Sequence, residues 1–237
     1  MIWPFSLFKN NTDGPDAALF ERYRQFREAG RGFNLTLAKQ LPKPAVQECG
    51  KKLGLFKAGT LILNNEDEIA ILYDYAFYHH RRADKNLIER VRENSPPEPD
   101  SVEAELLEAM AKSYYSLFRL EEIRPAKGAK LRDLLTDETL ELMDKGLGDT
   151  GMPGLILAGR ILPLSDFNLS SGTMIPLPEP VFQEKIAPIV EKFLNGKIPA
   201  PHPLLSAGQE AAFVAQIIRI SLHAAGEDNV FYTDMEA

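Results

Sequence analysis

The spacing of apolar residues changes near Tyr115, and this change limits what the chain can fold into. Before this point, apolar residues recur three and four positions apart, as on one face of an α-helix. After it, apolar runs of about four to eight residues alternate with turn-forming segments, which is typical of β-strands. We therefore predict an α+β fold, with helices before and after a central antiparallel β-sheet or small barrel at about residues 115–177.

The segment 95–100 holds three prolines and divides the chain into two regions. Residues 1–100 read as a helical amino-terminal region. Within it, Gly30 and Gly32 are expected to end a first helix, and a second short helix is expected at about 35–41. Residues 101–237 read as one helix, the compact β unit and two closing helices at about 181–194 and 206–225. The glycine-rich segment 146–154 reads as a turn.

The amino-acid composition limits the classes of protein to which this chain can belong. The chain has 237 residues, of which 44% are hydrophobic and 26% charged, as in ordinary globular domains. Cys49 is the single cysteine, so an intramolecular disulfide and a thiolate-rich metal site are excluded. No apolar run approaches the roughly 20 residues of a membrane helix, and the first residues lack the basic start of a signal peptide. We therefore expect a cytoplasmic protein without transmembrane insertion.

Charge is unevenly distributed along the chain. Residues 1–58 carry a net charge of +5 and residues 59–237 a net charge of −12, which together give −7. A basic head on an acidic body is compatible with a polyanion partner or with attraction between two parts of one fold. The second reading is favoured, because +5 over this length is modest for a nucleic-acid binder.

Four motifs in the middle of the chain resemble a known group of proteins. The motifs are Leu72-Tyr-Asp-Tyr-Ala-Phe-Tyr78, Ser113-Tyr-Tyr-Ser-Leu-Phe-Arg-Leu-Glu-Glu122, Leu131-Arg-Asp-Leu-Leu-Thr-Asp-Glu138 and Leu157-Ala-Gly-Arg-Ile-Leu162. They resemble uncharacterised bacterial proteins that often carry a carboxy-terminal SEC-C zinc motif. The resemblance covers about residues 65–175 and implies a small β-barrel supported by helices. The cysteine-rich SEC-C motif itself is absent, since Cys49 stands alone.

One predicted hairpin, at residues 119–132, combines cations with nearby aromatic residues. Small barrels with basic edges and aromatic side chains bind single-stranded nucleic acid by charge and stacking. Interleaved acidic residues at 121, 122 and 133 instead favour an ordinary solvated face. The candidate binding residues are Tyr115, Phe118, Arg119, Arg124, Lys130 and Arg132.

Catalytic and metal-binding patterns are weak. His79 and His80 are weak candidates for a metal site, because adjacent helical residues point about 100° apart and cannot readily share an ion. The tripeptide Asp149-Thr150-Gly151 occurs in aspartic proteases, but a loop precedes it here instead of a buried strand. We expect no metal, cofactor or catalytic residue, which leans against an enzyme. We predict a non-catalytic module that binds a protein or peptide. The alternatives are single-stranded nucleic-acid binding and a hydrolase with a His/Asp site.

The first eight residues are unusually apolar, with Ile2, Trp3 and Phe5 among them. Exposing this area to water is unfavourable by about 25 cal/mol per Å². We expect residues 2–8 to pack on the body of the protein or on a partner. The alternative is a peripheral membrane contact, supported by the nearby cations Arg22, Arg24 and Arg27, which are also candidate binding residues.

Overall fold

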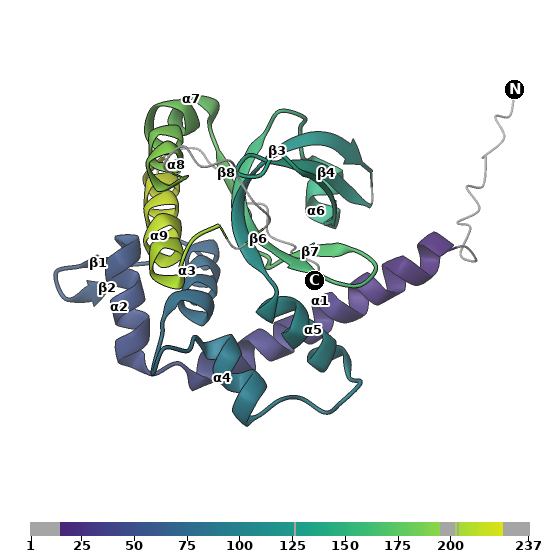
Figure 1. Cartoon of the computed structure of the whole chain (residues 1–237), viewed down its shortest axis with the longest axis horizontal. Coiled ribbons are helices and arrows are strands. Elements are labelled where there is room, and N and C mark those ends of the chain that lie inside the picture. Colours follow the sequence, from purple (N-terminus) through teal and green to yellow (C-terminus); the bar gives the residue numbers. More distant parts are fainter. Residues whose placement is uncertain (1–14, 126, 195–201, 203, 225–237) are drawn as a thin grey trace, which may run out of the picture.

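A computed structural model describes residues 15–125, 127–194, 202 and 204–224 (Figure 1). The helices before the barrel are α1 (Pro15–Gln40), α2 (Lys43–Leu53), α3 (Glu66–His79), α4 (Leu87–Asn94) and α5 (Val102–Ala111), with a small hairpin of β1 (Phe56–Lys57) and β2 (Thr60–Leu61) after α2. Within the described ranges, no helix is long and apolar enough to cross a membrane. The apolar segment 2–8 lies outside the described residues.

The central unit is a closed five-stranded barrel. Its elements are β3 (Tyr114–Arg124), β4 (Gly128–Asp133), β5 (Thr139–Met143), α6 (Lys145–Thr150), β6 (Ile156–Pro163) and β7 (Asn168–Ser170). The strand order is β3-β4-β5-β7-β6, and β6 returns to pair with β3. The long strand β3 closes the barrel because its first half pairs with β6 and its second half with β4. The predicted small barrel between two sets of helices is thereby confirmed.

The connectivity of this barrel is more specific than the sequence indicated. All pairings within it are antiparallel except that of β5 with β7, which are the third and fifth strands and run parallel. A helix, α6, lies between the third and fourth strands. This is the Greek-key connectivity of an OB-type barrel. A sixth strand, β8 (Ile175–Leu177), pairs with β6 outside the closed ring.

Three successive helical segments and a final helix follow the barrel. They are α7 (Glu179–Val181), the π-helical turn η1 (Phe182–Ile186), α8 (Ala187–Leu194) and α9 (Ala207–Ala224). Figure 1 shows α8 and α9 together on one flank of the barrel, next to β8, while α1 passes along another. The two predicted closing helices are therefore present.

Two hydrophobic clusters hold these layers together. The smaller fills the barrel interior, with Phe118, Leu131 and Ile161 among its members, and Leu147 of α6 plugs it. The larger lies between the barrel and the helices and runs from Tyr23 in α1 to Ile218 in α9. Side chains from both predicted regions therefore share one core.

Two local predictions were wrong. The chain forms one helix from residue 15 to 40 through Gly30 and Gly32, where an end was expected. Each interior glycine costs about 1 kcal/mol, but burial of Phe26 and Leu37 along the same helix offsets this cost. The segment after Asp144 is the short helix α6 and not only a turn, because the Asp144 side chain accepts a hydrogen bond from the Leu147 amide as an N-cap.

Candidate functional site

The cations of the predicted hairpin at residues 119–132 form ion pairs with nearby carboxylates. Arg132 contacts Glu121 at 2.6 Å and Asp137 at 2.9 Å, so two carboxylates face one guanidinium. The other cations also pair with carboxylates. The pairs are Arg119 with Glu179 at 3.0 Å, Arg124 with Glu141 at 2.9 Å and with Glu122 at 3.7 Å, and Lys130 with Glu121 at 3.4 Å. Arg132 and Arg119 also hold the pKa values of Glu121 and Glu179 below their usual range through these hydrogen bonds. A polyanion would therefore have to displace several carboxylates from this face.

The two aromatic residues predicted beside the hairpin are buried. Phe118 lies inside the barrel, and Tyr115 lies in the layer between the barrel and the helices. Neither ring is available to stack on a nucleic-acid base at the surface. Tyr115 instead belongs to a cavity described below.

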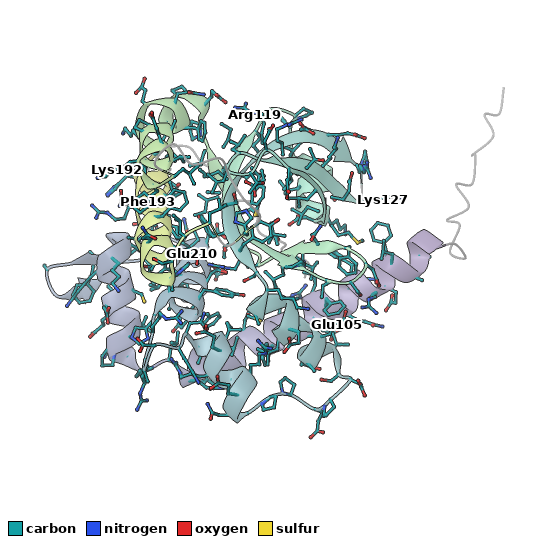
Figure 2. All side chains as sticks on the ribbon, viewed as in Figure 1. Glu105, Arg119, Lys127, Lys192, Phe193 and Glu210 are labelled. Carbon is teal, nitrogen blue, oxygen red and sulfur yellow. The ribbon has the colours of Figure 1, made fainter. Side chains whose placement is uncertain are left out.

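Two of the three candidate arginines of α1 join this helix to the rest of the fold. Arg22 pairs with Glu105 of α5, which Figure 2 labels, and with Asp166 at 3.1 Å. Arg27 contacts Asp144 at 3.3 Å and donates to the Ser170 backbone and side chain. These contacts support the favoured reading of the charge distribution, in which the basic head and the acidic body attract one another. The third arginine, at position 24, pairs with its exposed helical neighbour Glu21.

His79 and His80 point to different surroundings. His79 is buried beside Arg160, whereas His80 lies 3.7 Å from Glu48. In the part of the chain that the structure describes, no group of three or more histidine, cysteine or acidic side chains could hold a metal ion. Helix α3 places His79 in its last turn and Asp74 one and a half turns earlier, after an N-cap in which Asn65 accepts from the Glu68 amide.

A buried arginine that the sequence analysis did not single out forms the polar centre of the molecule. Arg160 of β6 is 1% exposed. Its Nε lies 3.4 Å from a carboxylate oxygen of Asp74, its Nη2 lies 2.9 Å from Nε2 of His79, and its guanidinium carbon lies 3.7 Å from the centre of the Tyr78 ring. Carboxylate, imidazole and aromatic face together offset the cost of burying the charge. The sequence signal was a single arginine within the apolar run 155–162.

Hydrogen-bond roles follow from the chemistry of arginine. A guanidinium has only donors, so His79 must accept at Nε2 and carry its proton on Nδ1. Burial, followed by the charge of Arg160, holds the pKa of His79 well below its usual value. His79 is therefore neutral and acts as a hydrogen-bond acceptor.

A second buried group of hydrogen-bonded side chains surrounds Asp133. One carboxylate oxygen accepts from the Ser116 hydroxyl at 2.7 Å and from the Leu135 amide at 2.8 Å, and the other lies 3.0 Å from Nε2 of His202. The His202 ring stacks on Tyr114 with 4.1 Å between ring centres. The carboxylate lies between the serine and the histidine, so Ser116 is not positioned as a nucleophile activated by an imidazole base.

One cavity of about 560 Å³ is lined by residues from both buried groups, the one around Arg160 and the one around Asp133. Arg160, His79 and Tyr115 line one part of it, and Tyr114 and His202 line another. Figure 2 labels Phe193 on α8 and Glu210 on α9, which contribute from the closing helices. His79 and His202, which are far apart in the sequence, thus line the same cavity. Their spacing along the chain gives no indication of this. The volume lies within the range of small-molecule pockets.

A more open groove of about 710 Å³ lies between α1, α3 and the chain after β7. Leu35 of α1 and Ile69 of α3 line it and remain 66% and 41% exposed. Small residues at positions 30, 38 and 70 and the aromatic rings of Tyr73 and Phe77 also line the groove. It is a concave, largely apolar surface on the helical side of the molecule.

Comparison with known proteins assigns a family without a known activity. No curated protein and no solved structure matches the chain. A family of unknown function (DUF7986) matches residues 17–192, a stretch that begins in α1, includes the whole barrel and extends into α8. The match covers well over half of the chain. The chain therefore belongs to this family of unknown function (DUF7986).

Proposed function

We propose that this protein is a non-catalytic interaction module that binds an amphipathic helix of a protein partner in the groove between α1 and α3. The observation that carries the proposal is the pair of exposed aliphatic side chains on facing helices, Leu35 and Ile69. Exposed apolar residues that line a hollow are typical of interaction sites.

The shape of the groove favours a helix as the occupant. Gly30, Ala38 and Ala70 line it and have almost no side chain, so a partner backbone can approach closely. The apolar rings of Tyr73 and Phe77 offer contacts to side chains that project from such a partner. In helix-in-groove recognition, the bound helix places apolar side chains, spaced three and four residues apart, into a hydrophobic groove.

The charges around the groove do not favour a polyanion. Arg27 and Arg31 line it, but so do Glu66 and Asp74. Cations and carboxylates are thus mixed, and the apolar lining is what selects a partner.

Selection of displayed amphipathic helical peptides tests this proposal. The double variant Leu35→Lys/Ile69→Lys places charge in the groove, and the matched control Ile62→Lys/Met152→Lys changes two exposed apolar residues outside it. Peptides selected on the native protein should bind the control with unchanged Kd and the groove variant at least about tenfold more weakly. Failure to select any peptide, or equal binding to both variants, contradicts the proposal.

Single-stranded nucleic-acid binding is a second candidate, favoured by the OB-type connectivity. The fully paired hairpin cations weigh against it. Fluorescence anisotropy with an oligothymidylate at low salt separates the two. Binding that falls steeply with salt and is lost in Lys130→Ala/Arg132→Ala would favour the nucleic acid. A hydrolase with a His/Asp site has weaker support, because no described imidazole is hydrogen-bonded to a nucleophile.

A further inference from the structure

The cavity beside Arg160 contains hydrogen-bonding capacity that the fold does not use. A guanidinium has five N–H donors. Within the described residues, Arg160 directs one to Asp74, one to His79 and one to Ser113 at 3.4 Å. One N–H on each terminal nitrogen is left for another acceptor. Guanidinium donors are frequently paired with a carboxylate, which accepts through two oxygens.

A buried hydroxyl in the same cavity also lacks a partner. The Tyr115 hydroxyl is enclosed and makes no hydrogen bond to any described residue. Its ring centre lies 5.8 Å from the Arg160 guanidinium carbon. Burial raises the pKa of Tyr115, so the phenol keeps its proton and remains a donor. Unpaired buried donors are costly, and an oxyanion in the cavity would satisfy them.

The remaining walls favour an apolar body attached to that oxyanion. Leu135, Phe193, Leu204 and Phe213 line the cavity. The stacked pair of Tyr114 and His202, with 16° between the ring planes, forms a flat wall suited to an aromatic ring. Such a mixture of apolar walls with a few convergent polar groups is typical of small-molecule sites.

The other charged residues in the lining do not favour either a cation or an anion, so the charge of the ligand depends on Arg160. Arg81 is already paired with Glu89 at 3.0 Å. Lys112 and Glu210 also line the cavity and oppose each other in sign. His79 accepts from Arg160 and adds no positive charge of its own. The uncommitted donors in the cavity lining therefore come from Arg160 and from the hydroxyls of Tyr115 and Tyr78, which make no hydrogen bond to any described residue.

We propose that this cavity binds a small molecule that joins a carboxylate to an aromatic or apolar body, with the carboxylate on Arg160 and Tyr115. The cavity shares Tyr78 and Met110 with the groove between α1 and α3, but Tyr115 lines the cavity alone and Leu35 and Ile69 line the groove alone. Variants of these three residues therefore test the two proposals independently. The ligand class follows from two unused guanidinium donors, the unused phenol donors of Tyr115 and Tyr78, and apolar walls in one cavity.

Calorimetric titration of the full chain with three probes tests the proposal. The probes are 3-phenylpropionate, its uncharged amide and inorganic phosphate. The carboxylate should bind with a Kd of about 1 mM or tighter, as expected for a fragment of this size. The amide lacks the charge and phosphate lacks the apolar body, so both should bind at least about tenfold more weakly. No binding of the carboxylate, or equal binding of either control probe, would overturn the proposal.

Two tyrosine variants separate recognition from folding. Tyr115→Phe removes only the unpartnered hydroxyl, so it should leave thermal stability unchanged or raised while weakening the carboxylate about tenfold. Tyr75→Phe is the matched control, because the Tyr75 hydroxyl donates to the Ala211 carbonyl at 3.0 Å and does not line the cavity. It should lower stability and keep the native Kd. An unchanged Kd in Tyr115→Phe would overturn the proposed contact.

Discussion

Arg160 of the barrel strand β6 and His79 of helix α3 meet through a 2.9 Å contact between Nη2 and Nε2. The two residues are 81 positions apart in the sequence. Because arginine can only donate, this contact fixes the tautomer of the imidazole and keeps it neutral. It also joins the barrel to the helical layer through two buried side chains.

The buried neutral histidine predicts a loss of stability in acid. The pKa of His79 is lowered in the folded state, so below about pH 6.5 the unfolded chain binds a proton that the folded chain does not. Stability therefore rises with pH through this window, by at most about 1.4 kcal/mol per pH unit from this residue. Urea unfolding from pH 5 to 8 should show this slope.

The variant His79→Gln isolates that effect. A glutamine oxygen can still accept from Arg160 but does not titrate. The difference in slope between native protein and variant should equal the histidine contribution. His223→Gln serves as the control, because His223 is exposed at the end of α9 and does not line the cavity beside Arg160. If stability changes with pH by the same slope in all three proteins, the assignment of this slope to His79 is wrong.

Asp74→Asn should be strongly destabilising. The variant keeps the shape of the side chain but removes the negative charge beside Arg160, which leaves a buried cation uncompensated. Breaking such a buried pair costs about 3–5 kcal/mol. Glu141→Gln removes a charge from a pair that is about half-exposed and should cost less than about 1 kcal/mol. Equal losses in chemical unfolding would show that burial of the Arg160 pair is not what matters.

Gly128 should resist replacement more than another glycine with a positive φ. Gly128 has φ of 142°, and an added Cβ would lie 1.9 Å from the Leu142 carbonyl oxygen of β5. Gly154 has φ of 91° but open space around its Cβ position. Gly154→Ala should cost about 1–3 kcal/mol of backbone strain. Gly128→Ala should cost clearly more than Gly154→Ala, because β4 and β5 must move apart to make room for the added Cβ. Equal melting temperatures of the two variants would contradict this prediction.

Cys49 should be inert in the folded protein. Burial in α2 raises the pKa of its thiol to about 12. The reactive thiolate is then scarce at pH 8, and the site is closed to reagents. Reaction with a disulfide reagent should be at least about a thousandfold slower than in urea-unfolded protein. Rapid labelling without denaturant is the opposing result.

Local pattern was sufficient to predict the class of fold. The change of period near Tyr115 predicted helices, then a small barrel, then helices, because strand and helix place side chains with different repeats. Asn65 and Ser101 act as N-caps of α3 and α5, a position that favours asparagine and serine. The similarity to SEC-C-associated proteins and the binding of a protein partner stay predictions.

Position in space decided what the sequence could not. The hairpin cations resembled a nucleic-acid site because the sequence does not show that Glu179 lies beside Arg119. Gly30 and Gly32 resembled helix ends because local propensity ignores the core that α1 buries. Arg160 passed unnoticed because its partners, Asp74 and His79, are far away in the chain. The sequence by itself determined most of the elements and their order, since these depend on neighbours within a few residues, but not the length of α1 or the helix α6. The cavity, the groove and every ion pair across the barrel depend on long-range packing, and only the tertiary structure decided them.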